Sequence, residues 1–107
     1  MRVDGSQFWL NKSLAADATS ATIDVAQMLG YAVQLVWTGA TADGTFTLEA
    51  SVDGANWELI PGSTVIASGP GSTIYNVTIS YYRYVRVQFD WSAGTGVVNG
   101  HIIQKGL

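Results

Sequence analysis

Cysteine is absent from this sequence, and charged residues are scarce. None of the 107 residues is a cysteine, so disulfide bonds and thiolate metal sites are excluded. Charged residues make up 12% of the chain, which is about half the share usual in soluble domains. Five basic and eight acidic residues give a net charge of −3, and only Arg83 and Arg86 lie close together among the basic ones. Nucleic-acid binding needs a larger basic cluster, so we expect no nucleic-acid partner.

Long apolar runs are missing as well. No run approaches the roughly 20 residues that a membrane-spanning helix needs. Residues 1–5, Met-Arg-Val-Asp-Gly, lack the apolar core of a signal peptide. We therefore expect no membrane partner, and we expect synthesis in a cytoplasm.

Groups that catalyse reactions or hold metals are few. The single histidine, His101, falls within a predicted strand, and no Gly-x-Ser-x-Gly motif accompanies it. We interpret it as either a hydrogen-bonded structural residue or a surface residue. One histidine and no cysteine exclude the common zinc sites. Asp43 and Asp53 each precede a glycine, where a turn explains them without calcium. We expect no catalytic residue, no metal, no cofactor and no enzymatic activity.

What the sequence does contain is alternation of apolar and polar residues, with turn signals about every ten residues, a pattern typical of β-sandwiches and barrels. The clearest strands are Thr45–Val52 and Tyr84–Trp91. Their alternation predicts these inward-facing side chains: Phe46, Leu48, Ala50, Val52, Val85, Val87, Phe89 and Trp91. The turn at residues 53–56 (Asp-Gly-Ala-Asn) predicts a hairpin to a strand beginning at Trp57. Asp43-Gly44 is expected to mark the reversal before Thr45.

Weaker signals complete the fold prediction. Further strands are expected at Gln7–Ser13, Thr22–Gln27, Tyr31–Thr38, Ser63–Ala67, Ser72–Ile79 and Val97–Gln104. Two segments of helical appearance, Leu14–Ala18 and Asp24–Leu29, are short and have β-branched neighbours, which argues against helices. We predict an all-β chain: a single antiparallel β-sandwich of seven or eight strands, with jelly-roll connectivity as one option. Residues 1–107 form one domain, in which residues 1–20 can be an N-terminal arm plus the first strand.

Two groups of aromatic residues are candidates for protein interaction. Tyr82 and Tyr84 lie with Arg86 on the face opposite the core in the predicted strand, and tyrosine and arginine are enriched at interfaces. A tyrosine packed at a sandwich corner is the alternative. Phe8 and Trp9 belong either to the first core strand or to an arm that docks onto a neighbour. The candidate interaction residues are Phe8, Trp9, Tyr82, Tyr84 and Arg86.

The hairpin resembles one found in discoidin-like domains. Residues 44–51 (Gly-Thr-Phe-Thr-Leu-Glu-Ala-Ser), 53–57 (Asp-Gly-Ala-Asn-Trp) and 82–87 (Tyr-Arg-Tyr-Val-Arg-Val) are similar to a pattern in these carbohydrate- and lipid-binding sandwiches. The residues concerned are largely structural and cover about half of the chain. Discoidin domains are longer and contain cysteines and ligand-binding spikes that this sequence lacks, so their ligand binding does not carry over.

The chain as a whole resembles small virion proteins of tailed bacteriophages. These include cysteine-free β-sandwiches rich in glycine, threonine and aromatic residues, with hairpins similar to residues 44–57. The resemblance implies a non-enzymatic structural protein of the virion, made in the host cytoplasm. Its first implied role is a capsid decoration or cement protein, stabilising a phage head through multivalent contacts with the major capsid protein or other virion proteins. A phage tail component is an alternative.

Two further expectations concern the surface. Outward positions of the predicted strands hold Thr, Ser, Gln and Tyr rather than the lysines that normally protect free sheet edges. We therefore expect a homo-oligomer or an assembly in which neighbouring subunits cover edges or faces. The other function left open is a carbohydrate-binding module that stacks sugars on Trp9, Tyr82 or Trp91.

Overall fold

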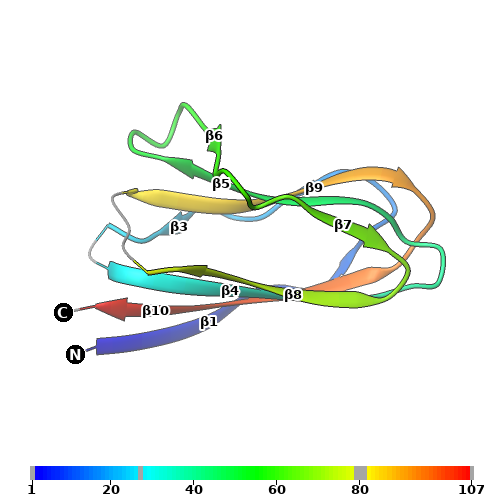
Figure 1. The fold of residues 1–107 in the computed structure, drawn as a ribbon, viewed down its shortest axis with the longest axis horizontal. Helices are drawn as coiled ribbons and strands as arrows, with labels where there is room; N and C mark the ends of the chain where they lie inside the picture. The colour runs from blue at the N-terminus through cyan, green and yellow to red at the C-terminus, as the bar shows by residue number, and fades with distance from the viewer. Residues whose placement is uncertain (1, 27, 79–81, 107) are drawn as a thin grey trace.

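The computed structural model describes residues 2–26, 28–78 and 82–106, which form a two-layer antiparallel sandwich. Figure 1 shows the two layers edge-on, with both chain ends at the same end of one layer. The predicted all-β sandwich is confirmed. Its strands are β1 (Arg2–Ser13), β2 (Ala18–Thr19), β3 (Ile23–Asp24), β4 (Met28–Thr38), β5 (Asp43–Ser51), β6 (Glu58–Leu59), β7 (Val65–Ser68), β8 (Gly71–Val77), β9 (Tyr84–Ala93) and β10 (Val97–Gly106).

The strands are divided between two sheets. One sheet has the order β1-β10-β4-β8, so the first and last strands are neighbours. The other has the order β2-β9-β5-β6, with β3 also pairing with β9 and β7 also pairing with β5. The ten strands exceed the seven or eight expected because each edge of the second sheet is made of two short segments. Two of the four sheet edges are therefore interrupted.

The core lies between the sheets and is filled by alternate residues of the long strands. Phe46 lies at its centre, with its ring centroid 4.7 Å from that of Phe89 and 5.0 Å from that of Trp37. The inward orientation predicted for six side chains is confirmed by their burial: Phe46, Leu48, Ala50, Val85, Val87 and Phe89. Period-two alternation was sufficient to identify them, because one face of each strand meets the opposite sheet.

Two side chains expected in the core lie outside it. Val52 is 71% exposed because β5 ends at Ser51 and the chain has already entered the turn. Trp91 is 44% exposed, next to an irregularity in the pairing of β9 with Asp43 and Gly44. Its indole Nε1 donates a hydrogen bond to the Gly94 carbonyl at 3.0 Å, which holds the ring at the end of the sheet.

The reversal predicted at Asp43-Gly44 is wrong. Both residues are already part of β5, and the turn comes earlier, where the Ala42 amide donates to the Gly39 carbonyl at 3.1 Å. This turn joins two different sheets, since β4 pairs with β10 and β8 whereas β5 pairs with β9. A local turn signal cannot distinguish such a crossing from a hairpin.

The segments that resembled short helices are extended or irregular. None of the residues that the structure describes in Leu14–Ala18 and Asp24–Leu29 is helical; Gln27 lies outside the described residues. Over the described ranges, no helix is long and apolar enough to cross a bilayer.

The turn after β5 forms as the sequence predicts. Asp53 Oδ1 accepts hydrogen bonds from the amides of Ala55 at 2.9 Å and Asn56 at 2.8 Å. Asp53 also pairs with the side chains of Asn56 and Ser51. These hydrogen bonds, led by the one from the Asn56 amide, hold the pKa of Asp53 well below its usual value. The returning strand β6 covers only Glu58–Leu59.

Replacing Asp53 with alanine is expected to lower the free energy of unfolding in a pH-dependent manner. Because the folded-state pKa of Asp53 is depressed, its carboxylate stabilises the fold above the unfolded pKa of about 4 and loses that effect as the pH falls. The difference between Asp53→Ala and wild type should therefore shrink steadily below about pH 4. Urea unfolding of both proteins from pH 7 to pH 2.5 measures it, and a difference independent of pH would contradict the role of the charge.

Candidate functional site

The five candidate interaction residues do not come together in the structure. Phe8 and Trp9 lie on β1 of the four-stranded sheet, whereas Tyr84 and Arg86 lie on β9 of the other sheet. Tyr82 precedes β9 and packs partly buried against the core. No common surface includes both groups, so they do not form one site.

The N-terminal pair belongs to a core strand. Trp9 is 6% exposed, and its ring centroid lies 5.5 Å from that of Phe8. The Phe8 ring lies over Gly100 of β10, where an added Cβ atom would come within 2.5 Å of it. Of the two alternatives for Phe8 and Trp9, the structure therefore supports the core strand and not the docking arm. Trp9 is too deeply buried to stack on a sugar.

The residues on β9 make contacts within the chain. Arg86 Nε donates to Glu49 Oε1 at 2.7 Å, and the guanidinium lies 4.1 Å from the centroid of the Trp57 ring. The Tyr84 ring covers Gly54, with its nearest atom 3.1 Å from the position a Cβ would take there. Arginine on the face of an aromatic ring is a favourable pairing that also immobilises the side chain. Arg86 and Tyr84 thus fasten β9 to the hairpin between β5 and β6.

Chemistry-bearing groups are dispersed. His101 is exposed on β10, and no group of three or more His, Asp or Glu residues capable of holding a metal ion occurs in the described part of the chain. Two buried tyrosines, Tyr31 and Tyr75, have hydroxyls without a hydrogen-bond partner among the described residues. Burial raises the pKa of Tyr75 to about 12 and that of Tyr31 further, with Tyr82 adding to the latter. Both hydroxyls therefore stay neutral at ordinary pH.

A different surface stands out, the side of the four-stranded sheet that faces away from the core. Cross-strand pairing places Gln7, His101, Gln34 and Ile74 in one row. The adjacent row contains Gly5, Ile103, Ala32 and Asn76. We call this surface the outer sheet face; it comprises Gly5, Gln7, Ala32, Gln34, Val36, Ile74, Asn76, His101, Ile103 and Lys105.

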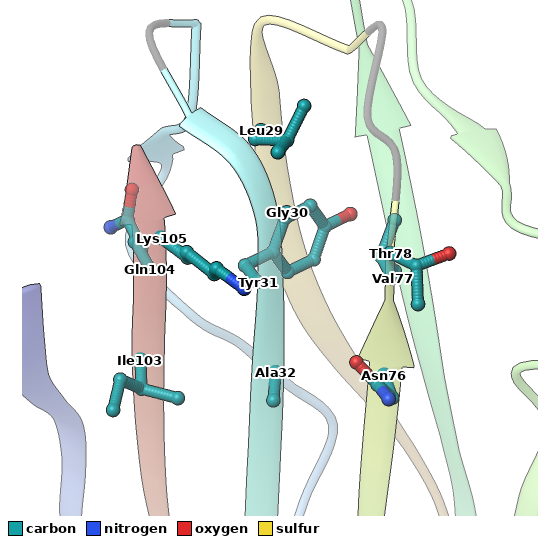
Figure 2. A pocket seen from close by; sticks show the side chains of 10 residues that line it. All are labelled: Leu29, Gly30, Tyr31, Ala32, Asn76, Val77, Thr78, Ile103, Gln104 and Lys105. Carbon is teal, nitrogen blue, oxygen red and sulfur yellow. The ribbon is translucent and has the colours of Figure 1, made fainter. Parts of the chain in front are cut away.

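Two shallow hollows mark the outer sheet face, and they share Ala32 and Ile103 in their lining. Their volumes are about 470 and 590 Å³. Figure 2 shows the first hollow, with Ile103, Ala32 and Asn76 on three adjacent strands and the Lys105 side chain extending over β4. At Gly30, next to Ala32, an added Cβ would lie 2.6 Å from the Val77 carbonyl oxygen, so only glycine fits there. Small residues on β4 thus leave space between longer side chains on its neighbours.

The outer sheet face carries little charge and mixes aliphatic side chains with amides. Three aliphatic side chains are exposed on it: Ile74 by 63%, Ile103 by 52% and Val36 by 42%. Among the described residues that line the hollows, Lys105 and His101 are the only ones with ionisable basic groups, and none is Asp or Glu. Exposed apolar residues gathered in a patch commonly mark a contact surface, whereas scattered ones do not.

The opposite side of the sandwich differs in charge. The outward side of the six-stranded sheet contains the Glu49–Arg86 ion pair. Aspartates at Asp43 and Asp90 lie on the same strands. Charge and hydrogen-bonded polar groups are typical of a solvated face. This side also exposes Leu59 and Ile66, so the two sides differ in charge rather than in exposed aliphatic residues. We take the outer sheet face as the candidate contact surface because it carries the fewer charges.

Sequence reasoning missed this surface although part of its signal was visible. The alternation in Val97–Gln104 places His101, Asn99 and Ile103 on one side of a strand. Ile74 and Ala32 complete the patch from β8 and β4, which are distant in sequence. The patch depends on which strands are neighbours, and that order was not predictable from local patterns.

Comparisons with known proteins identify the fold. A scan against protein-family models finds no match, and a search of curated proteins finds none either. Among solved structures, the SPBc2 prophage-derived protein YomS matches with a TM-score of 0.64 at 11% identity, over 96% of both chains. A protein of Bacillus endospore appendages, described as disulfide-linked pili, matches with a TM-score of 0.60 at 16% identity, over 98% of this chain and 88% of that one.

Larger proteins contain the same fold as one part. The PBSX exported protein XepA matches with a TM-score of 0.69 at 15% identity, and 97% of this chain covers 37% of XepA. VP2 of the infectious bursal disease virus subviral particle matches with a TM-score of 0.60 at 13% identity, over 98% of this chain and 32% of that one. An isomalto-dextranase of Arthrobacter globiformis also contains it, with a TM-score of 0.54 at 14% identity over 95% of this chain and 23% of that one. At these identities the likeness shows the fold, and at that level the predicted resemblance to phage β-sandwich proteins is confirmed.

Proposed function

We propose that this chain is a non-enzymatic structural protein of a phage virion, and specifically a decoration or cement protein of the capsid. The observation that carries the proposal is the outer sheet face, a surface of aliphatic and amide side chains with little charge on a small sandwich. Its partner would be the major capsid protein or another virion protein. Apolar side chains interspersed with amides, such as Gln34 beside Ile74, suit a protein partner better than a charged ligand.

The mechanism follows from repetition on a symmetric shell. Each copy would contribute a modest contact through the outer sheet face. Copies placed around a local symmetry axis would add contacts to one another, so that binding of the whole set exceeds that of one copy. A rigid sandwich suits this task because it presents a preformed surface and loses little conformational entropy on binding.

The strand order also supports the proposal. If β2 and β3 count as one position and β6 and β7 as another, the sheets have the orders 1-8-3-6 and 2-7-4-5. This alternation between sheets supports assignment to the jelly rolls, an architecture that includes viral capsid domains. Structural neighbours named as a prophage-derived protein and as a subviral particle of a virus add to the argument.

Two alternatives make different predictions. A tail component would use the same sandwich but bind tails rather than heads. A carbohydrate-binding module needs exposed aromatic rings, and Trp91 is 44% exposed, while the fold also occurs in an isomalto-dextranase. The Trp91 indole nitrogen is already bonded to Gly94, and no row of aromatic rings accompanies it on the described surface. We therefore rank sugar binding below virion assembly.

Co-sedimentation tests the proposal. Purified protein is mixed with phage heads lacking it, with complete particles and with isolated tails, and each mixture is pelleted. Saturable pelleting with the heads that lack it, and little with complete particles whose sites are filled, is expected. Pelleting with tails alone would favour the tail alternative. Absence from every pellet would overturn the proposal, and Trp fluorescence that changes on adding polysaccharide would favour the sugar-binding alternative.

A further inference from the structure

Among the described residues, strand β8 has a partner strand on one side of its backbone only. It is the last strand of the order β1-β10-β4-β8 and pairs with β4 alone over seven residues. Its register with β4 runs from Gly71 to Val77 without a shift, so the strand is regular along its whole length. A regular edge presents a row of amide and carbonyl groups that can bind another strand.

The other edges are shorter or interrupted. At the opposite edge of the sheet, the pairing of β1 with β10 shifts between Gln7 and Trp9 and again between Trp9 and Lys12. In the six-stranded sheet the edge segments β2, β3 and β6 have two residues each, and β7 has four. Bulges and short segments are ordinary protection against edge pairing. Over the described ranges, β8 is the one long and regular edge.

The composition of β8 lacks protection as well. Its sequence is Gly-Ser-Thr-Ile-Tyr-Asn-Val, with no charged residue and no proline. Ile74 stands at its centre and is 63% exposed. By contrast, β1 carries Asp4 and Lys12. A lysine or proline would discourage pairing, whereas β-branched residues such as Thr73 and Ile74 favour it.

The loop nearest to this edge is bonded to the other sheet. Residues 60–63, between β6 and β7, lie near residues 74–77 of β8, and a hollow of about 230 Å³ lies between them. Ser63 of this loop bonds to β5, since its Oγ accepts from the Leu48 amide at 3.1 Å and donates to the Leu48 carbonyl at 3.2 Å. These bonds fasten the loop to the six-stranded sheet.

We propose that β8 pairs with β8 of a second copy of this chain, antiparallel and about a two-fold axis at Ile74. Placing the two-fold axis at Ile74 pairs all seven residues of β8, because Ile74 is the middle residue of Gly71–Val77. An axis at any other residue of β8 leaves some of them unpaired. Ser72 then faces Asn76 of the second copy, and Ile74 faces its own counterpart. No like charges meet because β8 has none, and two exposed isoleucines are brought together. Because a two-fold contact uses the same edge of both copies, it joins two copies and leaves neither edge free for a third.

This pairing adds to the proposed function, because it identifies a second copy of the chain as the partner of the β8 edge. It would join the two four-stranded sheets into one continuous sheet, whose outer sheet faces form a single larger surface. The evidence for the β8 pairing is the regularity and composition of β8, however, so the pairing does not depend on whether the chain binds phage heads. A strand of another protein and a free edge are the other outcomes that the experiment distinguishes.

Cysteine trapping reads the register directly, because the natural chain contains no cysteine. Opposed Cβ atoms in antiparallel strands lie roughly 4.5–5.5 Å apart, close to disulfide geometry. Under mild oxidation, at least 50% of the Ile74→Cys protein should run as a cross-linked band at twice the 11.4 kDa chain mass on a non-reducing gel. Ser72→Cys and Asn76→Cys should each give no cross-linked band alone, because neither faces its own counterpart, and their equimolar mixture should cross-link. Ile66→Cys, which is 73% exposed on another edge, gives the background from collisions.

Solution mass gives a second measurement. Light scattering should find the wild type at twice the chain mass at micromolar concentration, and the double variant Ser72→Lys/Asn76→Lys at the chain mass. The matched control, Ser6→Lys/Leu10→Lys on β1, should remain dimeric. Circular dichroism verifies that each variant is folded. A wild type that is monomeric throughout, or Ile74→Cys that cross-links no more than Ile66→Cys, would overturn the proposal. A dimer that fails to pellet with phage heads would refute the proposed function alone.

Discussion

Replacing Phe46 with alanine is expected to destabilise the fold by about 3–5 kcal/mol, the range for large aromatic deletions in a packed core. Phe46 has no exposed surface and contacts Trp37 from one sheet and Phe89 from its own sheet. Its removal leaves a cavity between the layers that rigid β-strands cannot collapse to fill. Urea unfolding, followed by near-UV circular dichroism of the tryptophans, measures the change in the free energy of unfolding.

The matched control for Phe46→Ala is Ile66→Ala. Ile66 is on β7, pairs across from Thr45 of β5 and is 73% exposed, so its truncation should change stability by less than about 0.5 kcal/mol. Similar losses for the two variants would mean that the core is not centred where the structure places it.

Replacing Gly94 with alanine is expected to cost at least about 3 kcal/mol, because it combines two penalties. The φ of Gly94 is +76°, a conformation that costs an L-residue roughly 1–2 kcal/mol. In addition, an added Cβ would lie 1.7 Å from the Thr41 carbonyl oxygen, so the chain between β9 and β10 must move. The Thr95 amide, which donates to Thr41 Oγ1 at 3.2 Å, would lose that bond.

Gly62→Ala separates these two penalties. Gly62 has a similar φ of +80°, but nothing lies within 4 Å of the position its Cβ would take. Its substitution should therefore cost only the conformational term, about 1–2 kcal/mol by thermal unfolding. If Gly94→Ala were no worse than Gly62→Ala, the close approach of the β9–β10 connection to Thr41 would be contradicted.

The layers and the core were predictable from sequence because each strand carries its own alternation. Phe46 and Phe89 could be placed inside because their neighbours two residues away are also apolar. Exceptions came at the ends of strands, since β5 ends at Ser51, before Val52, and the pairing of β9 with β5 is irregular next to Trp91. A periodic pattern describes a strand but does not indicate where its partner stops.

The candidate contact surface was not predictable in the same way. Arg86 and Tyr84 have the composition of interface residues, but Glu49, Trp57 and Gly54 already occupy them within the chain. Those partners come from the hairpin between β5 and β6. The outer sheet face depends instead on the strand order β1-β10-β4-β8, in which neighbours are far apart in sequence. The pairing of strands distant in sequence therefore decides which aromatic residues find contacts within the chain and which aliphatic residues remain exposed.

The central claim is that the outer sheet face binds the virion, and one pair of variants tests it most directly. Ile103→Glu places a charge on that face, where Ile103 is 52% exposed and lines both hollows. Thr47→Glu places the same charge on the outward side of the six-stranded sheet. With phage heads that lack the protein, Ile103→Glu should pellet with at least tenfold lower affinity, equivalent to about 1.4 kcal/mol, and Thr47→Glu should match wild type. Equal binding by Ile103→Glu and wild type would contradict the claim.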